Sequence, residues 1–303
     1  MKRSPRVLSG SLVLVLLILI LALLGGGAWL VLKLRQPKIP PAQTPQMTAG
    51  SVSPIPAFFE KDLPESCRQV ALVVSPEDTS VTAELFLLVR NDARSPWTVD
   101  QGPIPVTLGR SGLAWGVGEH RASRPEGFRE KREGDGCSPA GIFRVPFVFG
   151  MAPEADARVE APALTLPYTH LADSIIGVDD PDSHYYNQVV DSNLVPRDWN
   201  SHEPMNRFKV LYRWGAFVAH NPEGVPNLGS CIFIHIWPGP GEPTAGCTGM
   251  ADADVVRVLT WLDPAKEPRL VQGLKAWCET SIDSHLTPPI PHEGDPAPGD
   301  KHP

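Results

Sequence analysis

Short apolar runs that end in turn residues recur along the middle of the chain. Apolar runs of four to eight residues bounded by turn residues are typical of β-strands. Six segments follow this pattern: QVALVVSP (69–76), AELFLLVRN (83–91), VTLGRSGLAWG (106–116), GIFRVPFVFG (141–150), VLYRWGAFVAHN (210–221) and SCIFIHIW (230–237). Together they predict a mainly β domain.

Helical periodicity is clear only in the segment ADADVVRVLTWLD, residues 251–263. Apolar residues there recur at the spacing that places them on one face of a helix. That face consists of Val255, Val256, Leu259 and Leu262. We expect Asp252 or Asp254 to cap the start of this helix. The sequence therefore predicts a mainly β domain with a few short helices.

The N-terminal region carries a different kind of apolar run. Residues 11–32 contain no charged residue, and a helix of about 20 apolar residues is long enough to span a bilayer. The apolar region of a cleaved signal peptide is usually shorter, about 7–15 residues. We therefore predict an uncleaved transmembrane anchor, with a cleaved signal peptide as the alternative. Residues 1–10 would then be cytoplasmic, although basic residues flank the run on both sides and do not settle its orientation.

Composition divides the rest of the chain. Residues 33–66 are rich in Pro, Ser, Thr and Gln, and residues 288–303 are again rich in Pro. Such segments cannot bury enough apolar area to fold, so we predict an extended linker and a disordered tail. Residues 67–287 would form one globular domain between them. The 34 Pro and 26 Gly among 303 residues favour a turn-rich architecture.

Charge and cysteine usage narrow the picture further. The net charge is −7 and the chain has no basic stripe, so nucleic acid is not expected as a partner. None of the five cysteines forms a CxxC pair, and an odd count outside the cytoplasm suggests two disulfides and one free thiol. Cys67 and Cys278 flank the globular domain. We predict that a disulfide between them joins its two ends.

The segment CIFIHIWPGPGEPTAGCTGM, residues 231–250, carries the candidate chemistry. A cysteine nucleophile needs a neighbouring base, because an isolated thiol with a pKa of about 8.5 is mostly protonated at neutral pH. A loop with three prolines and three glycines follows His235 and leads to Cys247, and it could bring the two side chains together. Gly246 would let a substrate carbonyl approach, and backbone N–H groups near Cys247 would stabilise its oxyanion. The alternative is a structural histidine and a buried cysteine without chemistry.

Four segments resemble, in order, the motifs of the YkuD-type L,D-transpeptidases, in the branch with a GSxIFxH…PTxGC motif. GSCIFIHIWPGPGEPTAGCTGM is similar to the active-site segment of that family. GDGCSPAGIFRV resembles its GDGxTPxGxF hairpin, with Ser138 in place of the usual Thr. VDDPDSHYYNQVV is similar to its DDPxSxxYN stretch, and AFVAHNPEGVPNLGS to the strand that leads into the catalytic histidine. The resemblance covers roughly residues 70–280.

The resemblance implies an activity and a role for each matching residue. Cys247 would be the nucleophile, His235 the general base, and Thr244 the residue at the family's Ser/Thr position. Gly246 and the backbone of Cys247 would form the oxyanion site. The expected fold is a β-sandwich or open barrel. The expected reaction cleaves a tetrapeptide stem of peptidoglycan after its third residue, releases D-alanine and transfers the acyl group to an amine, without a cofactor. The catalytic domain would then face outward from the cytoplasmic membrane.

Residues around the catalytic pair are candidates for substrate binding. These are Tyr186, Asn187, His220, Asn221 and Ser230. For His220 and Asn221, a turn before Pro222 is the alternative.

Two positions depart from the family. Thr248, Gly249 and Met250 stand where many relatives carry an arginine, which puts the donor subsite in question. Cys231 stands where this branch usually has alanine, and we expect a structural or disulfide-bonded thiol on the strand face of His235.

Other functions remain open at the level of sequence. The same nucleophile with water as acceptor would cleave cross-links or lipoprotein–stem bonds. A zinc hydrolase could use His220, His235 and Cys247 as ligands, although no HExxH-like helix supports it. A non-enzymatic cell-wall binding module is the third alternative.

Overall fold

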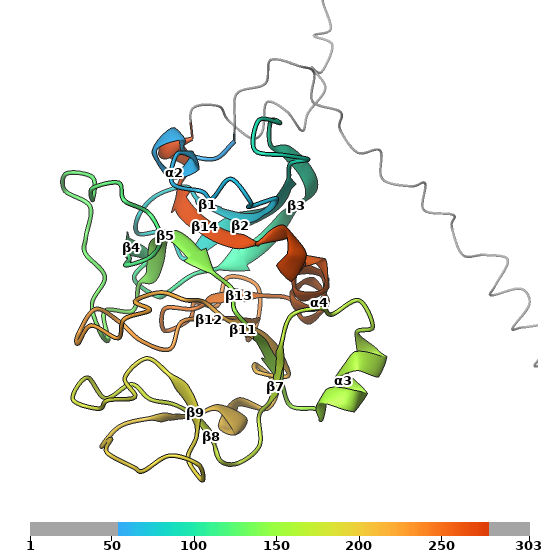
Figure 1. Ribbon diagram of the computed structural model, residues 1–303. Helices are drawn as coiled ribbons and strands as arrows, with labels where there is room; N and C mark the ends of the chain where they lie inside the picture. Colours follow the sequence, from blue (N-terminus) through green and yellow to red (C-terminus); the bar gives the residue numbers. More distant parts are fainter. Residues whose placement is uncertain (1–53, 279–303) are drawn as a thin grey trace, which may run out of the picture. The chain divides into compact units, whose positions relative to one another are not determined.

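The computed structural model describes residues 54–278, and this part of the chain is mainly β with a few short helices (Figure 1). Its larger sheet consists, in spatial order, of β4 (Leu113–Trp115), β5 (Ser138–Arg144), β14 (Arg269–Leu274), β1 (Gln69–Ser75), β2 (Thr82–Val89), β3 (Thr98–Thr107), β13 (Thr248–Met250), β12 (Phe233–Ile236), β11 (Trp214–Phe217), β6 (Val148–Gly150) and β7 (Tyr168–His170). A second sheet consists of β10 (Glu203–Pro204), β8 (Ile175–Gly177) and β9 (Val189–Asp191). The helices are α2 (Ala57–Glu60), α3 (Glu154–Glu160), α4 (Asp252–Trp261) and the 3₁₀ turns η1 (Met205–Phe208), η2 (Pro264–Lys266) and η3 (Lys275–Trp277).

The central strands follow from their uninterrupted apolar sequence. Every residue of β1 is buried, and β1 pairs in parallel with β14 and antiparallel with β2. A strand that is covered on both faces has a continuous apolar run instead of an alternating one. The strands predicted at 69–76 and 83–91 are confirmed, because β1 lies within the first segment and β2 overlaps the second from residue 83 to Val89.

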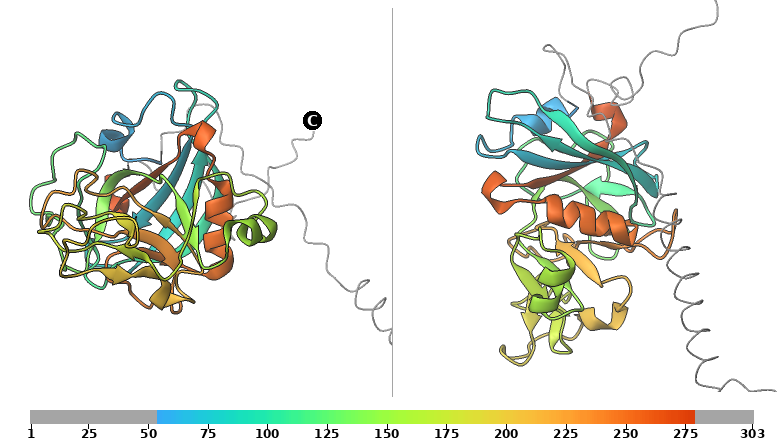
Figure 2. Two further views of the ribbon diagram at one scale, coloured as in Figure 1. Left: turned by 60° about the horizontal axis from the view of Figure 1, so that its bottom comes forward. Right: turned by 90° about the vertical axis from the view of Figure 1, so that its right-hand side faces the viewer.

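Helix α4 is confirmed, but its capping and its buried face differ from the prediction. Ala251 is the N-cap residue and makes no side-chain cap, whereas Asp252 and Asp254 lie in the first turn. Carboxylates at that position interact favourably with the helix dipole. The buried face uses Val258 in place of the predicted Val256, which is half-buried. Figure 2 shows α4 beside the larger sheet, where it contacts β11 and β12.

The folded domain begins before residue 67, which corrects the predicted linker boundary. Ile55, Phe59 and Leu63 are buried in the main core. The Phe59 ring stacks on Trp115 with 5.6 Å between ring centroids. Aromatic burial of this kind contributes strongly to a core, and it outweighs the Pro-rich composition of the segment. The linker that was predicted to reach residue 66 therefore ends by residue 54, and its earlier part lies outside the described residues.

The predicted disulfide between Cys67 and Cys278 is wrong in this structure, where both thiols are free. The parallel pairing of β1 with β14 explains why. Cys67 precedes β1, whereas Cys278 follows β14, so the two residues lie at opposite ends of paired strands. Five residues of strand span about 16 Å, and disulfides need Cα atoms within about 7 Å. The Cys67 thiol instead donates to the carbonyl of Gln69.

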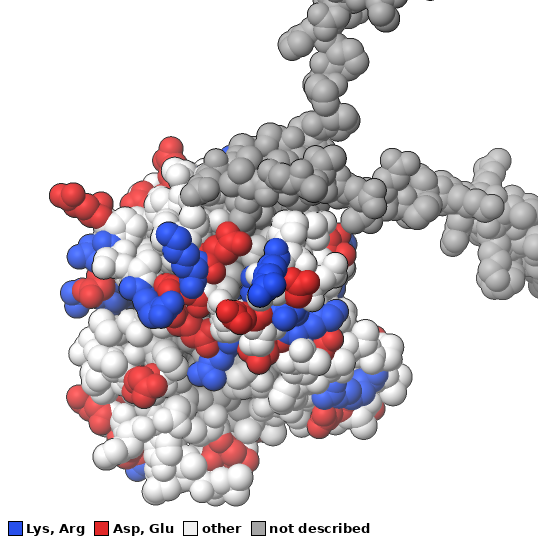
Figure 3. All heavy atoms as spheres, turned by 45° about the horizontal axis from the view of Figure 1, so that its top comes forward, with Lys and Arg blue, Asp and Glu red and all other residues white. Residues whose placement is uncertain are grey.

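The predicted membrane anchor at 11–32 lies outside the described residues, as do residues 1–10 and the tail at 288–303. Within residues 54–278, no helix is long and apolar enough to cross a bilayer. The surface of the domain carries both signs of charge. On the face in Figure 3, Lys and Arg side chains are interspersed with Asp and Glu.

Candidate active site

Two paired strands bring Cys247 and His235 to one cavity. β12 and β13 run in parallel, with Ile234 opposite Thr248 and His235 opposite Gly249. Cys247 directly precedes β13 and so lies beside the start of β12, the strand that carries His235. Cys247 and His235 both line a cavity of about 420 Å³.

The Cys247 thiol is buried and hydrogen-bonded to the backbone. The Phe233 N–H donates to Sγ at 3.4 Å, and Sγ lies 3.8 Å from the carbonyl oxygen of Cys231. Burial and then the carboxylate of Glu203 raise the pKa of Cys247 to about 12, although the Phe233 N–H and Lys131 act in the opposite direction. The resting thiol is therefore protonated at neutral pH.

The His235 ring is oriented with a lone pair available. Its Nδ1 lies 2.8 Å from the Ile236 carbonyl oxygen, and because a carbonyl only accepts, Nδ1 carries the proton. Nε2 then holds the lone pair that a general base needs. Burial lowers the pKa of His235. Within residues 54–278, no hydrogen bond joins this ring to the Cys247 thiol, so the pair shares a cavity without a direct bond.

The loop that carries the thiol is fixed by two hydroxyl groups. Thr244 Oγ1 donates to the Cys247 carbonyl at 2.6 Å, and Ser138 Oγ donates to the same oxygen at 2.9 Å. Ser138 in turn accepts the Gly109 N–H. Thr244, which the sequence placed in the candidate active-site motif, therefore anchors the loop that carries Cys247. Ser138 provides the equivalent support from β5.

Gly246 has a different role from the one predicted. Its N–H donates to Thr244 Oγ1 at 3.1 Å, so this N–H does not serve as an oxyanion donor. Of the two predicted oxyanion donors, the backbone N–H of Cys247 remains for that role. Its φ is +153°, and a Cβ at this position would lie 3.0 Å from the Cys137 carbonyl oxygen. Glycine is required here because the loop packs against Cys137.

Glu133 connects two of the predicted binding residues to the cavity. Ser230 Oγ donates to Glu133 Oε2 at 2.8 Å, and the Tyr186 hydroxyl donates to the same oxygen. Ser230 and Glu133 line the cavity. Tyr186 is buried behind them. Its burial is the largest cause of a raised pKa, and its hydrogen bond to Glu133 raises the pKa further. Tyr186 itself does not line the cavity and reaches it through its hydrogen bond to Glu133.

Asn187, His220 and Asn221 were predicted to bind substrate, but none of them lines the cavity. All three are buried and bonded to backbone. Asn187 Nδ2 donates to the carbonyls of His220 and Asn221, and its Oδ1 accepts the Cys231 N–H. The Asn221 side chain bonds the backbone of residues 225 and 229. These side chains satisfy buried backbone groups and shape the segment that leads into β12.

His220 is also held through its ring. The Val117 N–H donates to Nδ1 at 3.2 Å, and Nε2 lies 2.8 Å from the Leu228 carbonyl oxygen. With both nitrogens engaged, the zinc site considered for His220, His235 and Cys247 is not assembled. Among the described residues, no group of three or more His, Cys, Asp or Glu side chains could hold a metal ion.

We expect His220 to make stability depend on pH. Burial lowers its pKa from 6.5 to about 4, so between these values the unfolded chain binds a proton that the folded chain does not. Stability is complete above pH 6.5 and is lost as the pH falls towards 4, by up to about 3 kcal/mol. Urea unfolding of the full chain at pH 4–7, followed by tryptophan fluorescence, measures this slope.

The matched comparison uses two histidine variants. His220→Gln should flatten the slope between pH 6.5 and 4, and His170→Gln, at an exposed position, should leave it in place. An unchanged slope in the His220→Gln chain would mean that other groups carry the acid sensitivity.

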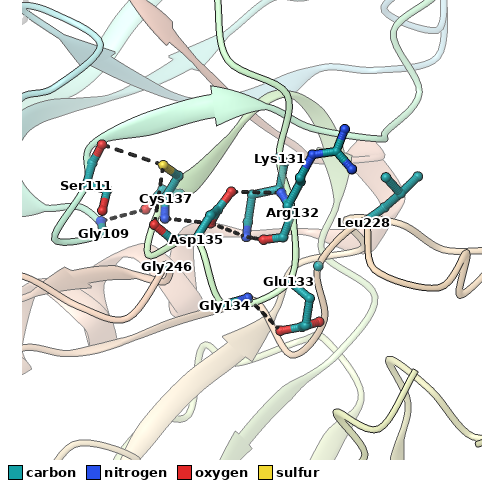
Figure 4. Close-up of polar contacts among 12 residues, drawn as sticks. Gly109, Ser111, Lys131, Arg132, Glu133, Gly134, Asp135, Cys137, Leu228 and Gly246 are labelled. Carbon is teal, nitrogen blue, oxygen red and sulfur yellow. Dashed lines mark hydrogen bonds and ion pairs between the residues drawn. The ribbon is translucent and has the colours of Figure 1, made fainter. Parts of the chain in front are cut away.

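The loop from Lys131 to Cys137 supplies site residues that the sequence analysis missed. Lys131 Nζ is buried and pairs with Asp135 at 2.7 Å (Figure 4). Asp135 also accepts the N–H groups of Arg132 and Cys137. This loop supports Gly246 through Cys137 and places Lys131 and Glu133 in the cavity wall. The charged residues 129–133, directly before GDGC, could have indicated that this loop contributes to the site.

The second sheet contributes further residues that the sequence did not indicate. Asp179 follows β8, Glu203 lies in β10, and both line the cavity. Glu203 accepts a hydrogen bond from the Tyr212 hydroxyl, and the Tyr212 ring meets His235 edge-on with 5.2 Å between centroids. Burial raises the pKa of Glu203. One wall of the cavity is therefore acidic.

Cys231 also lines the cavity. Its thiol is free, so the disulfide-bonded alternative is wrong. Cys231 has a φ of +52° and lies outside β12, so strand alternation does not determine its direction.

Comparison with known proteins gives no match: no family model, no curated protein and no solved structure matches this chain.

Proposed function

We propose that the chain is a cysteine-dependent L,D-transpeptidase that acts on peptidoglycan stem peptides. The observation that carries the proposal is the placement of Cys247 and His235 in one cavity, with the ring proton of His235 on Nδ1. A thiol, a base with an available lone pair and a cavity large enough for a peptide are the parts that acyl transfer requires.

In the first half of the proposed reaction, Sγ of Cys247 attacks the carbonyl carbon of the third stem residue. His235 Nε2 takes the thiol proton, and the Cys247 N–H stabilises the oxyanion. The C–N bond then breaks, the proton passes to the leaving amine, and D-alanine departs from a thioester. In the second half, an amine of a neighbouring stem attacks the thioester and loses a proton to His235. The proton returns to sulfur as the C–S bond breaks.

The proposal includes a finer fold assignment and a location. We assign the domain to the L,D-transpeptidase-like β-sandwich or open barrel, on the basis of four motifs that occur in the family's order. Because peptidoglycan lies outside the cytoplasmic membrane, the domain would face outward, anchored through residues 11–32. A reporter that is active only outside the cytoplasm should therefore be active when it is fused to the C-terminus.

Mass spectrometry of defined muropeptides tests the function directly. We expect the full-length chain, incubated with disaccharide tetrapeptides, to release D-alanine and to form cross-linked dimers. Formation of tripeptides without dimers would identify water as the acceptor and the chain as a hydrolase. Tetrapeptides that stay intact under all acceptor conditions would contradict both activities.

A further inference from the structure

Arg110 lies at the cavity and is tied to the nucleophile loop. It follows β3, and its backbone N–H donates to the Thr244 carbonyl at 2.9 Å. The neighbouring Gly109 forms a β-bridge with Thr244. Figure 4 shows Gly109 and Ser111, on either side of Arg110, beside Cys137 and Gly246. The main chain thus fixes Arg110 next to the residues that carry Cys247.

The Arg110 charge is not neutralised by a carboxylate of the described chain. Its guanidinium makes one long hydrogen bond, from Nη2 to the Gly134 carbonyl oxygen at 3.3 Å, and within residues 54–278 no Asp or Glu pairs with it. Lys131, the other cation of the cavity, pairs with Asp135. Arg132, nearby in the sequence, pairs with Glu130 at 2.6 Å. A guanidinium has five N–H donors, so Arg110 keeps donors for a ligand.

The surrounding backbone is shaped to hold this side chain over the cavity. A Cβ at Gly136 would lie 2.9 Å from Cγ, Nε and Cζ of Arg110, so the arginine side chain lies flat against this glycine. The residues after Cys247 present no cation there, because Thr248, Gly249 and Met250, which form the buried strand β13, are uncharged. Of the two cations that line the cavity, Lys131 is paired with Asp135, so Arg110 is the one without a carboxylate partner among the described residues.

The charges of the cavity are divided between its walls. Arg110 comes from a loop of the larger sheet, whereas Asp179 and Glu203 come from the smaller sheet. Glu133 also lies on the side of the larger sheet, where its carboxylate already accepts hydrogen bonds from Ser230 and Tyr186. A carboxylate ligand is attracted to the first wall and repelled by the second. This division gives a bound peptide one preferred direction.

We propose that Arg110 forms a carboxylate-binding subsite that holds the free C-terminus of the donor peptide beside Cys247. The inference rests on the proposed function for its substrate: the residue released from a tetrapeptide stem carries a carboxylate next to the scissile amide. Arginine binds carboxylates through two parallel N–H···O bonds. Such a contact fixes the register of the peptide and places its third carbonyl at the thiol.

Binding to a full-length Cys247→Ala chain tests the subsite without turnover. The probes are a stem tetrapeptide with a free C-terminal carboxylate and the same peptide as its C-terminal carboxamide, measured by calorimetry in detergent. We expect the acid to bind about tenfold more tightly than the amide, which corresponds to about 1.4 kcal/mol. Adding Arg110→Gln should weaken the acid about tenfold and leave the amide unchanged. The control Arg132→Gln, outside the cavity, should preserve the preference.

The outcomes separate the subsite from the enzymatic function. If the unaltered chain turns over tetrapeptides but Arg110→Gln leaves the acid preference intact, the subsite is wrong and the function stands. If the chain turns over no peptide but the preference depends on Arg110, the subsite stands as a peptide-carboxylate site and the function is wrong. If neither peptide binds, the subsite is overturned. Arg110→Lys, which keeps charge without the two-pronged geometry, should retain part of the preference.

Discussion

Replacing Cys247 with alanine should abolish acyl transfer from tetrapeptide stems and prevent any covalent adduct. The proposed reaction passes through a thioester on this sulfur, so its removal eliminates both half-reactions. Loss of an enzymatic nucleophile typically lowers turnover by at least about a thousandfold. Intact mass spectrometry of the full chain with substrate measures the adduct, and D-alanine release measures turnover.

The chain contains a closely matched control for this experiment. Cys231 is as buried as Cys247, at 7% and 8% exposure, and both thiols line the cavity. A Cys231→Ala chain should still form the adduct. If the Cys247→Ala chain still formed the adduct and the Cys231→Ala chain did not, Cys231 would be the nucleophile and the assignment to Cys247 would be wrong. Near-UV circular dichroism checks that each variant is folded, because both cysteines belong to a buried hydrophobic cluster.

Much of the fold could be predicted because the central strands are covered on both faces. β1 and β2 appear in the sequence as apolar runs between turn residues, and such runs predict strands from local sequence alone. The segment 54–66 was misassigned because its Pro-rich composition conceals the few aromatic and aliphatic residues that pack on Trp115. Whether such a segment folds depends on the surface available elsewhere in the domain, which a local pattern does not contain.

The site was predicted less completely, because polar residues have two uses that look alike in sequence. Asn187, His220 and Asn221 lie next to the active-site strands but bond buried backbone groups. Ser230 does reach the cavity. Nothing in the local sequence separates these cases, since the difference lies in which carbonyls and N–H groups the fold leaves unpaired. Asp179 and Glu203 were missed because they reach the cavity through the packing of one sheet against another.

The resting state of the thiol changes what a histidine substitution should do. The sequence alone suggests that His235 keeps Cys247 ionised, so that His235→Ala would lower the thiolate fraction at neutral pH. In the structure, burial and Glu203 raise the pKa of Cys247 to about 12, which leaves a thiolate fraction on the order of 10⁻⁵ at pH 7. Proton transfer to His235 must then accompany the attack instead of preceding it.

We therefore expect His235→Ala to lower kcat by about 10²–10⁴-fold while hardly changing alkylation of the resting thiol. In both chains the rate of alkylation by iodoacetamide should keep rising through pH 9–11, because burial sets the thiol pKa. In the unaltered chain, kcat/KM should fall on the acid side below pH 6.5, where the ring becomes protonated, since burial lowers the pKa of His235. That acid limb should vanish in His235→Ala and persist in His184→Ala, whose ring is exposed.

Two results would contradict this account in different ways. If His235→Ala kept full kcat, His235 would not be the base. If alkylation of the unaltered chain reached a plateau near pH 7 that His235→Ala removed, the resting enzyme would hold a thiolate–imidazolium pair. The proton would then already have left the sulfur before substrate binds, and the Glu203 carboxylate would have to be neutralised, because its charge beside Cys247 opposes a thiolate.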